Sequence, residues 1–200
     1  MKEFLNLSSV PQDQVPAILE NFILVNDFIS EDEELSLMKE IEPKLRRMRY
    51  QYDHWDDAIH GFRETEQVKW ADDNLRVLDR VRATAFPETS RLLPHVHVLD
   101  LADNGWIKPH IDSIKFCGSI ITGLSLLTDS VMKLDHEMDE KVSFTVLLKR
   151  RSLYIMRGVV RYNFKHAILR NEESYFNDRK IDKQRRVSVI CRNEPDESNS

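Results

Sequence analysis

The sequence predicts a mostly β protein in which two N-terminal helices support an antiparallel sandwich or barrel. From Pro94 onward, short β-branched or alternating runs follow one another without a helical pattern between them. Two segments with helical periodicity precede these runs, and each has an apolar side. The chain of 200 residues is long enough to bury one substantial core. One β domain with helical support is therefore the expected fold class.

The composition is that of an ordinary globular domain, with 41% hydrophobic and 32% charged residues. The 29 basic and 34 acidic residues give a net charge of −5, which argues against coating nucleic acid through bulk charge but leaves room for a local basic cleft. Two cysteines, Cys117 and Cys191, are too few for a disulfide framework and are expected to be small core residues. No apolar run reaches the length of a membrane span, so membrane insertion is not expected.

Three segments are predicted along the chain. Residues 1–22 form an N-terminal arm, of which 1–14 are expected to be loose, residues 23–193 form the folded domain, and residues 194–200 form a disordered acidic tail. The first residues, "MKEFLNLSSVPQDQ", contain neither the apolar stretch of a signal peptide nor the arginine content of a transit peptide.

The helical part begins with a short strand and turn at residues 21–30. Ser30 followed by Glu33 predicts a capping box for the first helix. The expected apolar face of that helix consists of Leu35, Met38, Ile41 and Leu45. A second helix is expected over residues 72–85, and its apolar side consists of Leu75, Leu78, Val81 and Ala85.

The segment between the two helices, residues 46–66, is polar, aromatic and charged, which predicts a strand and loop rather than a core helix. After Pro94, seven strands are predicted from the runs "HVHVLDL", "WIKPHID", "SIITGLSLL", "SVMKL", "SFTVLL", "SLYIMRG" and "RRVSVICR". Turn residues or charges separate these runs, and no helix is expected between them. That pattern is typical of an antiparallel sandwich or barrel.

One predicted strand carries a possible metal site. In "WIKPHID", His110 and Asp112 point to the same face, because side chains two residues apart share a face of a strand. Two such groups on an inward face need a metal, a proton or a cation as partner. They supply two of the three ligands of a 2-His-1-carboxylate site for non-haem Fe(II), and His166 is the best candidate for the third.

A rival group has similar spacing. In "HVHVLD", His95 and His97 share a face and Asp100 follows, so this run alone deserves comparable weight. The last predicted strand, "RVSVICR", favours the first group. It places Arg186 and Arg192 on one face over about 20 Å, where they could hold a short dicarboxylate between them. A solvated edge strand is the alternative, and "KQRR" at 183–186 is expected to be a solvated turn with only Arg186 turned inward.

This ordered set resembles the AlkB family of Fe(II)/2-oxoglutarate-dependent dioxygenases, in which His-x-Asp, a distal His and an Arg-x5-Arg strand form the site. The similarity to the mitochondrial branch of that family runs from about Ile23 to Asn193. It is closest in "YDHWDDAIHGFRETE", "HVLDL", "IKPHIDSIKFCG", "GLSLL", "SLYIMRG" and "RRVSVICR". The resemblance implies a double-stranded β-helix, or jelly-roll, core supported by the N-terminal α-helices.

The resemblance also implies roles for single residues. It makes His110, Asp112 and His166 the iron ligands, Arg186 and Arg192 contacts of 2-oxoglutarate, and Tyr154 a hydroxyl donor to 2-oxoglutarate. The implied cofactors are Fe(II), 2-oxoglutarate and O2. Two departures concern co-substrate affinity: "LDLADNGW" stands where the family has Asn-x-Tyr, and the Arg-x5-Arg strand contains Ser188 and Ile190 instead of Asn and Thr.

The function implied is hydroxylation or demethylation of a protein or RNA substrate in the mitochondrial matrix, with links to alkylation-induced programmed necrosis and fatty-acid metabolism. A candidate base-flipping lid at residues 46–64 interleaves arginines with Tyr50, Tyr52 and Trp55. It also carries three aspartates that would repel phosphates, so bulk DNA binding is not expected; these are Asp53, Asp56 and Asp57. The alternative function is a catalytically weak metal-binding scaffold or sensor that acts through partner proteins.

Overall fold

A computed structural model describes residues 2–52 and 58–195. The helices are α1 (Val15–Asn21), α2 (Glu31–Leu45), α3 (Asp72–Ala85) and α4 (Gly158–Asn163), with 3-10 turns η1 (Lys2–Phe4) and η2 (Asn171–Glu173). The strands are β1 (Leu5–Ser9), β2 (Phe22–Val25), β3 (Ile59–Gln67), β4 (Val96–His110), β5 (Ile120–Leu126), β6 (Ser130–His136), β7 (Ser143–Leu148), β8 (Ser152–Arg157), β9 (Phe164–Ile168), β10 (Tyr175–Phe176), β11 (Arg179–Lys180) and β12 (Arg186–Arg192).

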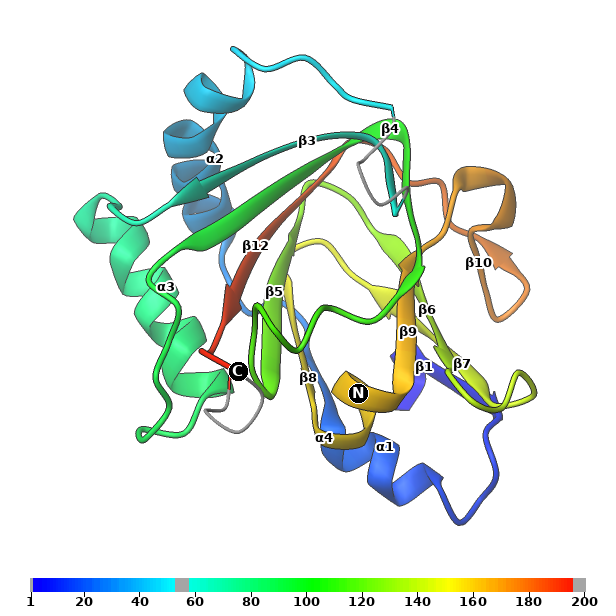
Figure 1. The fold of residues 1–200 in the computed structure, drawn as a ribbon. Coiled ribbons are helices and arrows are strands. Elements are labelled where there is room, and N and C mark those ends of the chain that lie inside the picture. The colour runs from blue at the N-terminus through cyan, green and yellow to red at the C-terminus, as the bar shows by residue number, and fades with distance from the viewer. Residues whose placement is uncertain (1, 53–57, 196–200) are drawn as a thin grey trace.

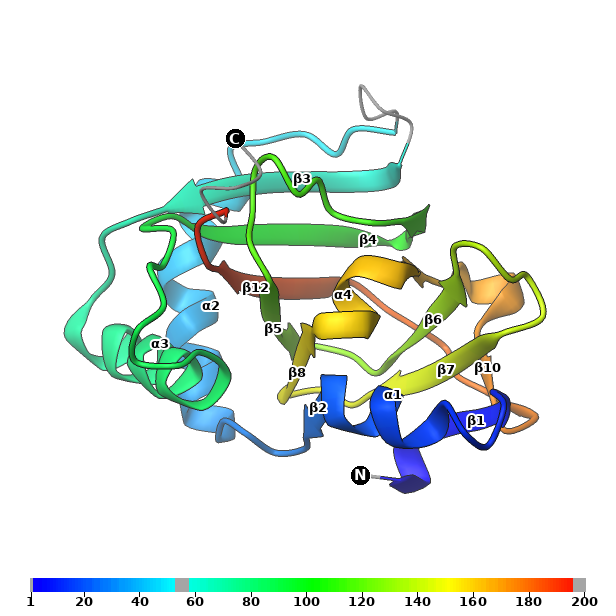
Figure 2. The same ribbon diagram turned by 60° about the horizontal axis from the view of Figure 1, so that its bottom comes forward.

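Ten of these strands form one curled sheet with the order β1-β7-β6-β9-β4-β12-β5-β8-β2, and β3 pairs with β4 beside this path. All the pairs are antiparallel. The sheet folds over so that β12, β5 and β8 face β6 and β7 (Figure 1, Figure 2). The predicted mostly β, jelly-roll class is confirmed.

Strand β4 connects the two layers. Its first half pairs with β12 and β3, whereas Ile107 and His110 pair with Ile168 and His166 on β9. The runs "HVHVLDL" and "WIKPHID" were predicted to be two strands, and this division is wrong: they belong to one strand of 15 residues. The strand continues because "ADNG" forms no turn here but an irregular stretch, where the register with β3 shifts. The register with β9 shifts further on, between Ile107 and His110.

The two long helices cover the outer face of the β5–β12 layer (Figure 1). The predicted capping box of α2 is confirmed, since Glu33 N–H donates to Ser30 Oγ at 3.1 Å and Ser30 N–H donates to Glu33 Oε2 at 2.8 Å. The predicted apolar face is only half right. Leu35 is 63% exposed, and the buried residues are Glu34, Leu37, Ile41 and Leu45. The prediction of α3 over residues 72–85 is confirmed.

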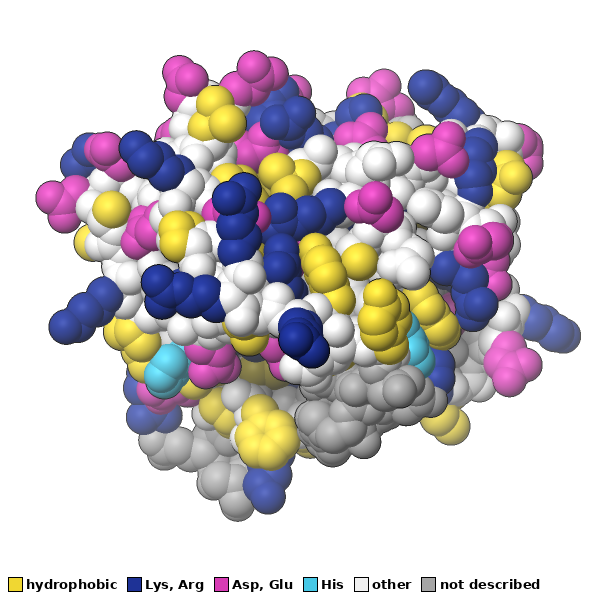
Figure 3. Space-filling view, turned by 90° about the horizontal axis from the view of Figure 1, so that it is seen from above, with side chains coloured by type: hydrophobic (Ala, Val, Ile, Leu, Met, Phe, Trp, Pro, Cys, Tyr) yellow, Lys and Arg dark blue, Asp and Glu magenta, His cyan; other side chains and the backbone are white. Residues whose placement is uncertain are grey.

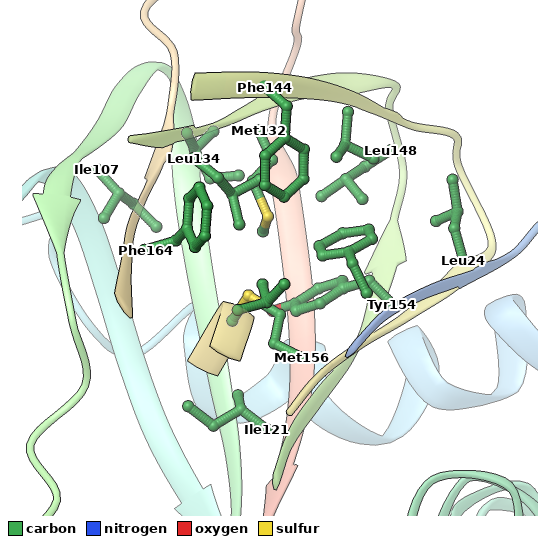
Figure 4. Packing of buried hydrophobic residues seen from close by; sticks show 14 of the residues in the cluster. Leu24, Ile107, Ile121, Met132, Leu134, Phe144, Leu148, Tyr154, Met156 and Phe164 are labelled. Atoms are coloured by element: carbon green, nitrogen blue, oxygen red, sulfur yellow. The ribbon is translucent and has the colours of Figure 1, made fainter. Parts of the chain in front are cut away.

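The main core lies between the two sheet layers. Met132, Phe144 and Phe164 from one layer meet Tyr154 and Met156 from the other (Figure 4). A second apolar cluster fills the space between the sheet and the two long helices, with Leu37, Leu78 and Val189 among its members. Together the two cores pack against both faces of the β5–β12 layer. The open end of the curled sheet is not filled by either core.

Three local predictions are wrong. Residues 5–9 were expected in a loose arm, but they form β1 and pair with β7, because Leu5 is buried against the core. The short helix α4 interrupts the region that was expected to contain strands alone. The "KQRR" turn is only partly solvated: Gln184 is exposed, but Lys183 as well as Arg186 is turned inward, and Lys183 donates to Ala102 O and Asp103 O at 3.2 and 2.9 Å.

None of the helices in the described part of the chain combines the length and the apolar composition that crossing a bilayer requires. The predicted division at residues 22 and 193 stays a prediction. Most of the predicted tail, residues 196–200, lies outside the described residues.

Candidate metal centre

The three residues predicted as a metal site lie together. His110 ends β4, Asp112 follows it, and His166 sits opposite His110 on β9. Asp112 Oδ1 is 3.3 Å from His110 Nε2 and 3.6 Å from His166 Nε2. The two imidazole centroids are 4.3 Å apart. In the described residues, this is the one group of three or more potential ligands whose donor atoms all lie within 4.8 Å of one another.

Hydrogen bonding prepares His110 for this role. Its Nδ1 lies 2.9 Å from the carbonyl oxygen of Lys108. A carbonyl oxygen can only accept, so Nδ1 carries the proton and Nε2 presents its lone pair toward Asp112 and His166. A metal-binding imidazole is usually oriented through its other nitrogen in this way.

The charges of the group suit a cation. Burial raises the pKa of Asp112, but the close approach of His110 and the charge of Arg192 outweigh this effect, and the pKa lies well below its ordinary value. Burial, with a contribution from His110, lowers the pKa of His166 to about 3. The group therefore holds one ionised carboxylate and one imidazole that stays neutral at physiological pH.

Arg192 pairs with the other oxygen of this carboxylate. Its Nε and Nη2 each donate to Asp112 Oδ2 at 3.0 Å, while Nη1 donates to His97 Nδ1 at 3.3 Å. Burial lowers the pKa of Arg192 and Asp112 raises it, and the net effect is a raised pKa. Arg192 thus leaves Asp112 Oδ1 directed at the two histidines.

Arg186 lies deeper, and none of the described carboxylates forms an ion pair with it. It is 1% exposed, and its Nε and Nη1 donate to Ser125 Oγ and Ser188 Oγ at 3.2 and 3.1 Å. Its Nη2 has no hydrogen-bond partner among the described residues. Burial lowers the pKa of Arg186. A buried guanidinium with an unpaired N–H donor costs folding free energy unless an anion accepts a hydrogen bond from that donor.

Tyr154 on β8 lines the same part of the cavity as Arg186. Burial raises the pKa of its phenol more than the nearby positive charges of Arg186 and Arg192 lower it. Its hydroxyl lies against Gly123 on the paired strand β5, where an added Cβ would stand 2.6 Å from Tyr154 Oη. Gly123 therefore provides the space that this hydroxyl occupies.

A cavity joins the two parts of the site. Polar lining comes from His97, His110, Asp112, Tyr154, His166, Arg186, Ser188 and Arg192, and apolar lining from Ile59, Leu99, Ile107, Ile121, Met132, Ile168 and Ile190. The free space, including the open mouth, is about 490 Å³. All six residues predicted for metal and co-substrate binding border this one space.

The rival group does not assemble. Asp100 is fully buried between Arg63 and Arg185, at 2.7 and 2.8 Å. His95 is exposed, and His97 faces Arg192 and Glu64. The spacing of "HVHVLD" could not reveal this, because the two arginines that bind Asp100 are remote in sequence.

The candidate lid is described only in part. Trp55 and the aspartates 53, 56 and 57 lie outside the described residues. Tyr50 is not free to stack a base, because its hydroxyl donates to Asp100 Oδ1 at 3.2 Å and the Arg63 guanidinium lies 4.5 Å from its ring centroid. Tyr52 is 62% exposed.

No protein-family model matches the chain. Two curated relatives do, both called "Alpha-ketoglutarate-dependent dioxygenase alkB homolog 7, mitochondrial", from Mus musculus and Bos taurus. Each is 56% identical over 169 residues, which are 84% of this chain and 76% of the relative. The chain belongs to the AlkB homologue 7 family. It is an α-ketoglutarate-dependent dioxygenase of the AlkB type.

Solved structures agree with this assignment at the level of the fold. The structure of OsALKBH1 superposes with a TM-score of 0.64 at 12% identity, over 86% of this chain and 97% of the other. A Trichoplax adhaerens prolyl hydroxylase, in complex with a peptide of the hypoxia inducible factor oxygen degradation domain, gives 0.62 at 8% identity, over 94% and 88%. The AlkB-type fold predicted from the sequence is therefore confirmed.

The predicted AlkB resemblance, dioxygenase class and 2-oxoglutarate dependence are likewise confirmed by the two relatives. Their names also confirm a mitochondrial localisation, whereas the matrix stays a prediction. The AlkB motifs did not point to His97 and Ser125, which contact the arginines of the site, or to Glu64, which contacts His97. The alternation of "HVHV" was the one signal that could have placed His97 on the inner face.

Proposed function

We propose that this dioxygenase hydroxylates or demethylates a protein or RNA in the mitochondrial matrix, with Fe(II) held by His110, Asp112 and His166. Roles in alkylation-induced programmed necrosis and fatty-acid metabolism belong to the same proposal. The observation that carries it is the proximity of two groups in one cavity. A His-Asp-His group with one negative charge borders the same space as a buried, incompletely bonded Arg186.

Fe(II), 2-oxoglutarate and O2 together supply an oxidant that can insert oxygen into a C–H bond. The donor set fits ferrous iron, since two imidazole nitrogens and one carboxylate oxygen leave further coordination positions open. His110 offers Nε2 because its Nδ1–H is bound to a carbonyl. Asp112 offers Oδ1 because Arg192 binds Oδ2.

Arg186 would bind a carboxylate of 2-oxoglutarate through Nη2, which is buried and without a partner among the described residues. Tyr154 would donate its hydroxyl to the same anion, because burial keeps the phenol protonated. Arg192 would be shared between this anion and Asp112. Ile121, Met132 and Ile168 on the wall exclude water from the reacting atoms.

The surface around the site favours a substrate that binds through a few contacts in one groove rather than through an extended phosphate-binding surface. Figure 3 shows several Lys and Arg side chains near the middle of the upper face, with Asp and Glu side chains mostly around them. A groove with about 1080 Å³ of free space, including its open mouth, adjoins the cavity, with lining by Glu64, Thr65, Glu66, His97, Phe116 and Arg192. Its two glutamates disfavour a phosphate backbone, whereas the exposed Phe116 could contact a base or an apolar side chain.

The test begins under anaerobic conditions. The purified protein with Fe(II) and 2-oxoglutarate should develop a visible charge-transfer band, and oxygen with a mitochondrial RNA or peptide library should then release succinate. The His110→Ala protein should show no band although it folds, whereas a His95→Ala control should behave as wild type because His95 is exposed and away from the cavity. A band without turnover on either library would favour the scaffold or sensor alternative.

A further inference from the structure

A chain of hydrogen bonds runs from the rim of the groove to the proposed iron ligand. Glu64 Oε2 is 2.8 Å from His97 Nε2, and His97 Nδ1 is 3.3 Å from Arg192 Nη1. Arg192 Nε and Nη2 then bind Asp112 Oδ2, each at 3.0 Å. The four side chains come from β3, β4, β12 and the segment after β4.

The chemistry of the donors fixes the protons in this chain. A guanidinium has no acceptor, so Nδ1 of His97 must accept from Arg192 and carries no proton. In the neutral ring the proton then lies on Nε2, which donates to the Glu64 carboxylate. Glu64 therefore selects the one neutral tautomer of His97 that can hold Arg192.

These hydrogen bonds restrain the Arg192 guanidinium group on two of its edges. Without His97, the Arg192 guanidinium could turn about its last torsions and still meet Asp112 in several geometries. With His97, Nη1 is fixed on one side and Nε and Nη2 on the other, and all the donors lie in one plane. Only Oδ1 of Asp112 then remains to face His110 and His166.

We propose that His97 and Glu64 are positioning residues for the metal centre, which act through the orientation of Arg192. This inference rests on the proposed iron site and deepens it. Neither residue would touch iron. Their effect is to hold the Asp112 carboxylate in the rotation that presents one oxygen to the metal, and supporting partners of this kind commonly affect metal affinity about 10-fold to 100-fold. Because Glu64 and His97 line the groove, a substrate bound there would contact this chain of hydrogen bonds directly.

The experiment titrates Fe(II) anaerobically at excess 2-oxoglutarate and follows the charge-transfer band. His97→Leu removes the acceptor and should raise the Fe(II) concentration at half-saturation about tenfold. His97→Gln should stay within about threefold of wild type, because the amide oxygen can accept from Arg192 and the amide N–H2 can donate to Glu64. Rescue by glutamine and failure of leucine would separate positioning from simple packing.

Glu64 offers a second route that does not disturb the core, since its side chain is 36% exposed. Glu64→Leu should weaken Fe(II) binding as His97→Leu does, and the double variant should be no weaker than either single variant. Glu64→Gln keeps an acceptor for His97 and should resemble wild type. His95→Leu, an exposed histidine two residues before His97, is the matched control for the loss of an imidazole.

The outcomes separate this inference from the proposed function. Absence of a band in the wild-type protein would overturn the iron site itself. A normal wild-type band with His97→Leu and Glu64→Leu both within twofold of His95→Leu would overturn the positioning role alone. Additive losses in the double variant would also contradict it, because they would mean that the two residues act independently.

Discussion

Arg186 is a buried cation that donates hydrogen bonds to two serine hydroxyls, with no carboxylate within ion-pair distance in the described residues. Such a side chain costs folding free energy in the empty protein and recovers it when an anion binds. Arg186→Met removes the charge and keeps much of the volume. We expect the free energy of unfolding of the ligand-free variant to rise by about 1 kcal/mol.

The same variant should lose the stabilisation by 2-oxoglutarate. With a redox-inert divalent metal and 2-oxoglutarate at about 100 times the dissociation constant, wild type should gain about 2.7 kcal/mol, and Arg186→Met much less. Thermal unfolding with and without 2-oxoglutarate measures both effects. A variant that is less stable without ligand and equally stabilised by 2-oxoglutarate would show that Arg186 is a structural residue.

Residue patterns predicted which side chains face the cavity better than they predicted the burial of single residues. Side-chain alternation placed Arg186 and Arg192 on one face, and both line the cavity. It could not show that Glu34 is buried, because the reason is a remote ion pair with Arg150 at 2.6 Å and a hydrogen bond from Leu127 N–H. Polar residues that are buried through distant partners have no local signature in a sequence.

At the scale of elements, the bend in β4 is what brings the site together. Gly105 lies against Gly61 in this bend, and a Cβ on Gly105 would stand 2.4 Å from the Gly61 carbonyl oxygen. Beyond the bend, β4 leaves β12 and pairs with β9, which sets His110 opposite His166. The periodicity of "HVHVLDL" and "WIKPHID" predicted both halves, but nothing local indicates that "ADNG" continues the strand.

Gly105→Ala should therefore damage the metal centre from a distance. The added methyl group meets backbone atoms that cannot rotate away, so the strand must shift, at a cost of about 1–3 kcal/mol in stability. We expect Fe(II) binding to weaken more than in Asn104→Ala, which changes an exposed neighbour. Anaerobic Fe(II) titration and thermal unfolding of both variants provide the check. Equal Fe(II) affinity in the two would mean that the bend does not set the position of His110.

At the scale of the whole molecule, the sequence predicted the fold class but not the order of the strands. The order β9-β4-β12-β5 places the ligands and the arginines on one inner surface, and these strands come from residues 96 to 192. Such pairings depend on contacts between segments far apart in the chain. Resemblance to the AlkB family supplied this long-range information, because the local patterns of the strands fit several sandwiches and barrels.

The charge distribution leads to a last prediction, about nucleic acid. The net charge is −5, and Glu64 and Glu66 line the groove beside the site, so few phosphates can be neutralised together there. We expect duplex DNA of arbitrary sequence to bind no more tightly than about 10⁻⁴ M near 150 mM salt. Fluorescence anisotropy over a salt series measures both the affinity and its slope. A micromolar dissociation constant with a steep slope would indicate an extended phosphate-binding surface. In that case, a substrate bound through local contacts would no longer be the best account of the groove.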